Sequence, residues 1–180
     1  MKLTIGSEVV FFACLIVAYL YFWRDGHFQK QVAESLHPGK TAVFTGLLLL
    51  SSGSFYLAEK AYRNLSAGMV KVFLFFTLAL GLIFLFGQAR EYYHLISSGV
   101  SISKTEFGSS FFTLTGFHAL HVLIGLILLF IIWLLLLMNK FGLHRQNVLE
   151  TAGLYWHFVD AVWLCVFTVI YLIPYLTGAT

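Results

Sequence analysis

Charged residues are scarce in this chain. Asp, Glu, Lys and Arg together make up 11% of its 180 residues, whereas soluble domains average about 25%. Hydrophobic residues make up 59% and are spread along the whole chain, which excludes a soluble domain and favours one membrane domain over residues 1–180. The net charge is only +3, and the basic residues lie between apolar runs rather than in one patch, so nucleic-acid binding is not expected.

Cysteine is equally rare. Cys14 and Cys165 each lie deep in an apolar run, and neither belongs to a CxxC pair, so a disulfide framework is not indicated. We interpret both as small buried hydrophobic residues. The N-terminal run resembles a secretory signal, but Glu8 interrupts it and no small-x-small cleavage site follows. We therefore expect an uncleaved first transmembrane helix.

Long apolar runs fill most of the sequence. A helix needs about 20 apolar residues to cross the hydrocarbon core of a membrane. Five runs meet this requirement, so the sequence predicts an all-α integral membrane bundle of five transmembrane helices. Their predicted bounds are residues 6–23, 41–58, 70–88, 107–138 and 148–174. The fourth would be about 48 Å long as a straight helix, so it must tilt, kink or protrude from the core.

The basic residues are nearly balanced across the predicted membrane. Because five crossings place the two ends of the chain on opposite sides, the N-terminal side carries six Lys and Arg residues and the other side five. The positive-inside rule then favours a cytoplasmic N-terminus and an outside C-terminus, by a single charge.

Ionisable side chains inside apolar runs are costly, so they mark candidate sites. His157 and Asp160 share one face of the fifth predicted helix, and His118 and His121 share one face of the fourth. Counted from the short loop between these helices, Asp160 lies about 20 Å deep and His121 about 26 Å. We therefore expect a hydrogen-bonded Asp–His network between the two helices. A proton-conducting or catalytic role is the alternative.

The same side chains are of metal-ligand types. Glu91-x-x-His94 fits half of a di-iron pattern, but that pattern needs two such motifs and two further glutamates. A haem held by two histidines needs them at equal depth, and the estimated depths of His118 and His157 differ too much. We expect no catalytic, cofactor-binding or metal-binding residue in this chain. An independent membrane metalloprotein or b-type cytochrome is the alternative of a different class.

Four further charged residues are candidate sites. Glu8 is the other acid inside an apolar run. It is either an interfacial glutamate, because only seven residues precede it, or a functional intramembrane carboxyl group, and the sequence leaves both readings open. Glu59, Arg90 and Glu91 lie at predicted helix ends. For the two glutamates a solvated or loop-pairing role is expected.

Six stretches together carry a family resemblance. In chain order they are SEVVFF at 7–12, LSSG at 50–53, QAREYY at 88–93, GSSFF at 108–112, TGFHALHV at 115–122 and YWHFVDAVW at 155–163. The chain resembles subunit III of the haem–copper respiratory oxidases over almost its whole length. The mitochondrial type has seven helices, and this chain is similar to the five-helix form of several bacterial oxidases, including quinol oxidases. Glu8 then matches the intramembrane glutamate of the family's third helix.

The resemblance implies a function. It implies that the chain carries no haem or copper and packs against subunit I, which holds the haem–copper centre, with subunit II in the same complex. It also implies support of sustained turnover and proton uptake, bound phospholipid, and a bacterial or archaeal plasma membrane. The donor, cytochrome c or quinol, stays open. A related accessory subunit of a nitric oxide reductase is the alternative complex. Glu8 is the best candidate for a functional carboxyl group.

Overall fold

The computed structural model describes residues 2–24, 38–100, 106–140 and 146–176. Within this part every regular element is a helix. Five helices there are long and apolar enough to cross a membrane, which confirms the predicted all-α bundle of five spans. The helices are α1 (Lys2–Trp23), α3 (Pro38–Arg63), α4 (Ala67–Ser97), α5 (Glu106–Leu137) and α6 (Gln146–Phe167), which continues through the π-helix η2 (Thr168–Leu172) into α7 (Ile173–Leu176).

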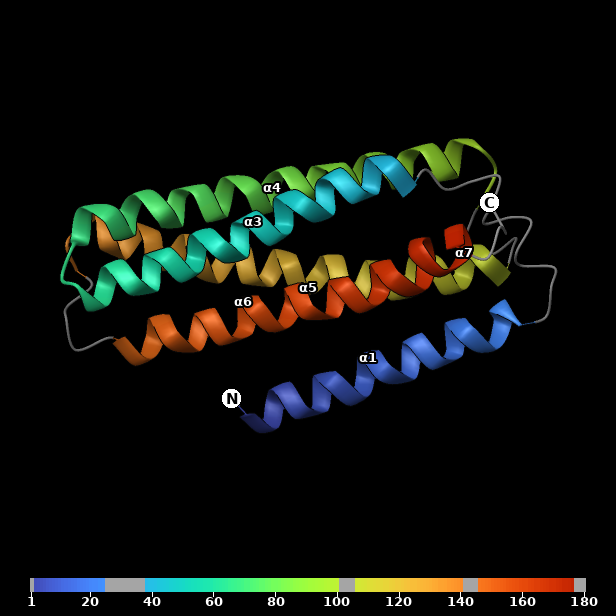
Figure 1. Cartoon of the computed structure of the whole chain (residues 1–180), viewed down its shortest axis with the longest axis horizontal. Helices are drawn as coiled ribbons and strands as arrows, with labels where there is room; N and C mark the ends of the chain where they lie inside the picture. Colours follow the sequence, from blue (N-terminus) through green and yellow to red (C-terminus); the bar gives the residue numbers. More distant parts are fainter. Residues whose placement is uncertain (1, 25–37, 101–105, 141–145, 177–180) are drawn as a thin grey trace.

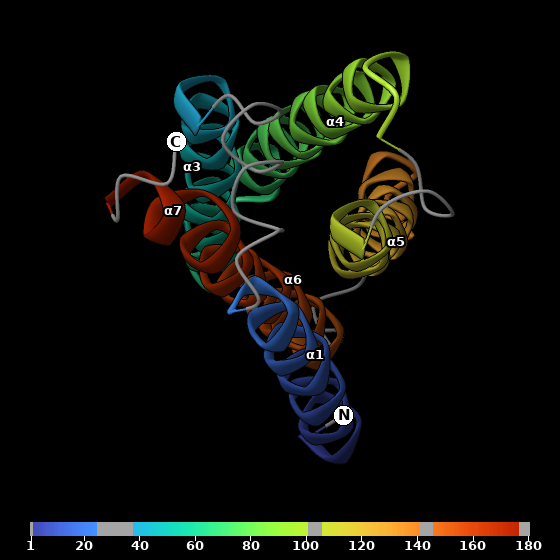
Figure 2. The same cartoon turned by 90° about the vertical axis from the view of Figure 1, so that its right-hand side faces the viewer.

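The helices lie side by side along the long axis of the molecule (Figure 1). α3 and α4 share the most extensive contact, and α6 packs on both α3 and α5. α1 lies along the outer edge of the bundle, where it packs against α5 and α6 (Figures 1 and 2). A smaller share of α1 than of any other described span is buried. The bundle is therefore four closely packed helices with α1 attached to one side.

Two helices are longer than the apolar pattern predicted. α3 continues to Arg63 and α4 to Ser97. Glu59 therefore lies inside a helix rather than in a loop, and Arg90 and Glu91 lie within α4 rather than at its end. Hydropathy marks only the part of a helix that suits hydrocarbon, whereas the backbone hydrogen bonds continue through polar residues beyond it.

Trp156 of α6 lies at the centre of the bundle and is fully buried. Its indole N–H donates to Ser51 Oγ of α3 at 3.2 Å. Its ring packs over two glycines: a Cβ added to Gly81 of α4 would lie 3.0 Å from the ring, and one added to Gly125 of α5 would lie 2.9 Å from it. One side chain of α6 thus contacts the other three helices of the core.

The two cysteines are not buried, contrary to the sequence interpretation. Cys14 and Cys165 are both exposed on the outside of the bundle. In a membrane protein the outer surface faces lipid and is as apolar as the core. Hydrophobicity therefore does not distinguish a lipid-facing position from a buried one.

The C-terminal end of α6 is wider than an ordinary α-helix. In η2 the Ile173 N–H donates to the Thr168 carbonyl, five residues back. Pro174 follows and has no N–H to donate, so the ordinary pattern is broken at this point. The extra residue in the turn lets Ile170 and Tyr171 both face the interior, and both are buried.

We expect Gly125→Ala to destabilise the protein. The new methyl group would meet the rigid ring of Trp156, and overpacking of this kind costs about 1–3 kcal/mol. Gly53→Ala is the matched control, because a Cβ there meets nothing within 4 Å. Thermal unfolding of the two variants in mild detergent measures the difference. Equal melting temperatures would show that the ring does not depend on this glycine.

Candidate functional site

Three fully buried aromatic side chains of the last helix donate hydrogen bonds to side chains of α3 and α4. Besides Trp156, the indole N–H of Trp163 donates to Thr45 Oγ1 at 3.0 Å, and the hydroxyl of Tyr171 donates to Glu91 Oε2 at 3.0 Å. We call Trp156, Trp163 and Tyr171 the donor row. Their spacings of seven and eight residues are close to two helical turns, so they lie on one face.

The acceptors of the donor row lie on α3 and α4. The Ser51 hydroxyl itself donates to the Leu48 carbonyl at 2.6 Å, and the Thr45 hydroxyl donates to the Thr41 carbonyl at 2.8 Å. Each hydroxyl therefore donates to its own helix and accepts from α6. An unpaired N–H in hydrocarbon costs several kcal/mol, so these bonds fix how far α6 can slide along α3.

Sequence reasoning missed the donor row. The signal was present, because tryptophan and tyrosine recur at helical spacing in the last apolar run while serine and threonine recur in the second. None of the three side chains carries a formal charge, which is the property that marked the other candidate sites.

Glu8 and His121 pair where α1 meets α5. Glu8 Oε2 lies 3.1 Å from His121 Nε2, and the Tyr155 hydroxyl of α6 donates to the His121 carbonyl at 3.1 Å. The side chain of Glu8 is 32% exposed and that of His121 is 14% exposed. Glu8 therefore faces the bundle and joins α1 to α5.

The hydrogen bonds of His121 fix where its proton lies. Its Nδ1 lies 2.7 Å from the Phe117 carbonyl, which can only accept, so Nδ1 carries a proton. Nε2 then either accepts from a protonated Glu8 or, as part of an imidazolium, donates to the Glu8 carboxylate. Both arrangements give the pair a net charge of zero, which suits surroundings of low dielectric constant.

The expected hydrogen bond between Asp160 and His121 is wrong. His121 uses both ring nitrogens on Phe117 and Glu8. Asp160 is buried, and its carboxyl lies beside the Ser52 hydroxyl of α3 rather than His121. Trp156 packs on Gly125 and Trp163 stacks on His118, so Asp160 and His121 lie at similar heights. Height gives no information about direction, and His121 contacts Glu8 of α1.

The other two histidines belong to separate contacts. His157 Nδ1 lies 2.5 Å from Ser52 Oγ, and this hydroxyl also lies beside the Asp160 carboxyl. His118 is fully buried and stacks on Trp163 with ring centroids 4.7 Å apart. Neither of its ring nitrogens has a hydrogen-bond partner within the described part of the chain. The four predicted residues therefore do not form one network.

Glu91 is half-buried and accepts hydrogen bonds from other helices, a role that the sequence did not predict. Besides Tyr171, Thr41 donates to it, with the Thr41 Oγ1 to Glu91 Oε1 distance at 3.2 Å. The described residues contain no group of three or more His, Cys, Asp or Glu side chains placed to hold a metal ion. Glu59 packs directly over Gly153 of α6, whereas Arg90 is exposed. Glu91 and Glu59 therefore contribute to helix contacts.

We expect Glu8→Gln to leave the stability nearly unchanged. The glutamine amide can donate to His121 Nε2, as a protonated carboxyl group does. Glu8→Leu leaves this nitrogen unpaired and is expected to cost about 0.5–1.5 kcal/mol. Cys14→Ala, an exposed position on the same helix, is the control. Thermal unfolding checks the order, and a large loss with Glu8→Gln would indicate an ion pair instead.

A double-mutant cycle tests the central contact of the donor row. Trp156→Phe removes the N–H and Ser51→Ala removes its acceptor, so we expect a coupling energy of about 0.5–1.5 kcal/mol. Ser54→Ala replaces Ser51→Ala in the control cycle, because the Ser54 hydroxyl donates to the Phe73 carbonyl instead. Strictly additive effects in the first cycle would refute the hydrogen bond.

Comparison with known proteins places the chain in a family. The model of the family described as cytochrome c oxidase subunit III matches residues 1–175. Cytochrome c oxidase subunit 3 of Corynebacterium diphtheriae is 36% identical over 172 residues, which cover 94% of this chain and 84% of that protein. Cytochrome bo(3) ubiquinol oxidase subunit 3 of Pseudomonas aeruginosa is 36% identical over 174 residues, covering 92% and 79%. The chain is a multi-pass membrane protein and belongs to the cytochrome c oxidase subunit III family.

Proposed function

We propose that this chain is a non-catalytic subunit III that stabilises subunit I of a haem–copper terminal oxidase, supports its proton uptake and binds phospholipid. The observation that supports the proposal is that polar side chains inside the membrane form hydrogen bonds with one another. The donor row and its acceptors bind one another across helices. These groups hold the bundle together, and the oxygen-reducing haem and copper belong to the partner subunits.

The proposed support of proton uptake rests on Glu8. It is the acid of the peripheral helix, it is partly exposed, and its Oε2 lies 3.1 Å from His121 Nε2. Its helix α1 has the smallest buried share of the described spans, so most of that helix is open to a neighbouring subunit. We also propose a bacterial plasma membrane with a cytoplasmic N-terminus as the location.

The electron donor follows from the partners rather than from this chain. One relative is named as a cytochrome c oxidase subunit and another as a ubiquinol oxidase subunit. Both carry comparable identity to this chain, so either complex is compatible with the sequence.

Purification of the tagged full-length chain in mild detergent tests the proposed function. We expect a haem-bearing partner to co-purify with it, giving a Soret band and a copper content that follow the partner. The same preparation separated in a harsh detergent is the control, in which the chain alone should carry no Soret band. A chain that always migrates without a haem-bearing partner would contradict the proposal. A partner with haem but without copper would favour a nitric oxide reductase.

A further inference from the structure

A cavity lies where α3 begins and α4 approaches its end. Its volume is about 90 Å³, and Lys40, Arg90, Glu91 and His94 are among the side chains that line it. A single water needs about 10–15 Å³ on the same measure, so the cavity has room for a larger polar group. It lies at the ends of two spans, Gly39–Arg63 and Ala67–Ser97, where lipid headgroups meet hydrocarbon.

The positive charges of this cavity have no ion-pair partner in the part of the chain that the structure describes. Among the described residues, the ion pairs join Arg63 to Glu150 and His121 to Glu8. Lys40 and Arg90 take part in neither. Both are exposed, and both line the cavity. Two cations at one opening attract an anion.

The start of α3 adds to this positive field. Lys40 is the third residue of a helix that begins at Pro38, so it lies in the first turn. The unsatisfied N–H groups of that turn already carry partial positive charge, and a lysine there is unfavourably placed. An anion held between Lys40 and Arg90 would offset both effects.

Glu91 does not cancel these cations by pairing with them. Its Oε1 accepts from Thr41 at 3.2 Å. Its Oε2 accepts from Tyr171 at 3.0 Å, and the Gln88 amide lies 3.5 Å from the same oxygen. The carboxyl group is thus turned toward donors of α3, α4 and η2. Among the described side chains that line the cavity, one acid stands against the two cations Lys40 and Arg90, so this lining carries a net positive charge.

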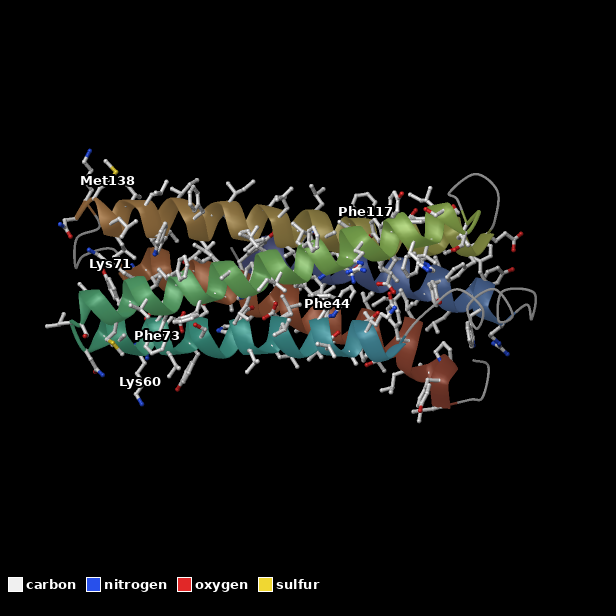
Figure 3. The ribbon with its side chains drawn as sticks, turned by 90° about the horizontal axis from the view of Figure 1, so that it is seen from above. Phe44, Lys60, Lys71, Phe73, Phe117 and Met138 are labelled. Carbon is white, nitrogen blue, oxygen red and sulfur yellow. The ribbon has the colours of Figure 1, made fainter. Side chains whose placement is uncertain are left out.

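The inner wall of the cavity is apolar. Phe44 of α3 packs on Gly87 of α4 so closely that a Cβ there would lie 2.7 Å from its ring. Figure 3 labels Phe44 between these two helices. Leu95 lines the same cavity. A polar opening over an apolar wall, at the membrane boundary, suits an amphiphilic ligand better than a free ion.

We propose that this cavity binds the phosphate group of an anionic membrane phospholipid, with Lys40 and Arg90 as donors. The Arg90 guanidinium presents its N–H groups in a fork that matches phosphate oxygens, and the Lys40 ammonium adds a point charge. The inference deepens the lipid-binding part of the proposed function and rests on it. It does not require an oxidase partner, so the two can fail separately.

Native mass spectrometry of the full-length chain tests this site. Phosphatidylglycerol is titrated into detergent-purified protein, and phosphatidylcholine serves as the uncharged comparison. We expect Lys40→Ala and Arg90→Ala each to weaken binding of the first phosphatidylglycerol about tenfold, as loss of a charge-assisted hydrogen bond predicts. Arg90→Lys keeps the charge and should lose less. Lys60→Ala is the matched control, because Lys60 lies on the same helix at its other end (Figure 3).

The outcomes separate the possible occupants. Unchanged phosphatidylglycerol binding in both alanine variants, with normal melting temperatures, overturns the proposal. Inorganic phosphate that displaces the lipid at millimolar concentration would show a site for free phosphate instead. Lipid bound to the isolated chain but absent from the co-purified complex would mean that a partner side chain fills the cavity. Lipid binding with the expected variant effects, in a chain that finds no haem-bearing partner, would contradict only the oxidase role.

Discussion

The position of the Trp156 ring determines how the helices of the core pack. Lipid is as apolar as the helix surfaces, so burial of hydrophobic side chains does not itself bring membrane helices together. Close approach and hydrogen bonds must do so. Trp156 combines both, since its ring needs glycine at Gly81 and Gly125 while its N–H needs Ser51. These contacts place α6 against three other helices at once, and the rest of the donor row continues the same interface.

α1 is attached in a different way. It contributes few buried residues, chiefly Phe12 and Tyr19, to the core. Its polar link to α5 is the Glu8–His121 pair, which Tyr155 of α6 joins through the His121 carbonyl. Only 11% of the span in α1 is buried, so most of its surface is free for neighbours. Glu8, the best candidate for a functional carboxyl group, therefore lies on the helix with the smallest buried share.

The sequence predicted the helices well and their contacts poorly. Apolar runs long enough to cross a membrane identified all five spans, because that length is a physical requirement. The same hydrophobicity misled for Cys14 and Cys165, which face outward. Depth along a helix placed Asp160 and His121 at one level but could not give the direction in which each points. That direction depends on how α1, α5 and α6 rotate about their axes, which only the packed structure shows.

The donor row and the proposed phosphate cavity are linked through Glu91. The π-turn of η2 brings Tyr171 inward, one residue later than regular α-helical spacing from Trp163 would place it. Its hydroxyl and that of Thr41 then hold the two oxygens of Glu91. A carboxyl group engaged in this way cannot swing out to pair with Arg90. The contact that ends the donor row therefore also keeps the cations at the membrane boundary available to an external anion.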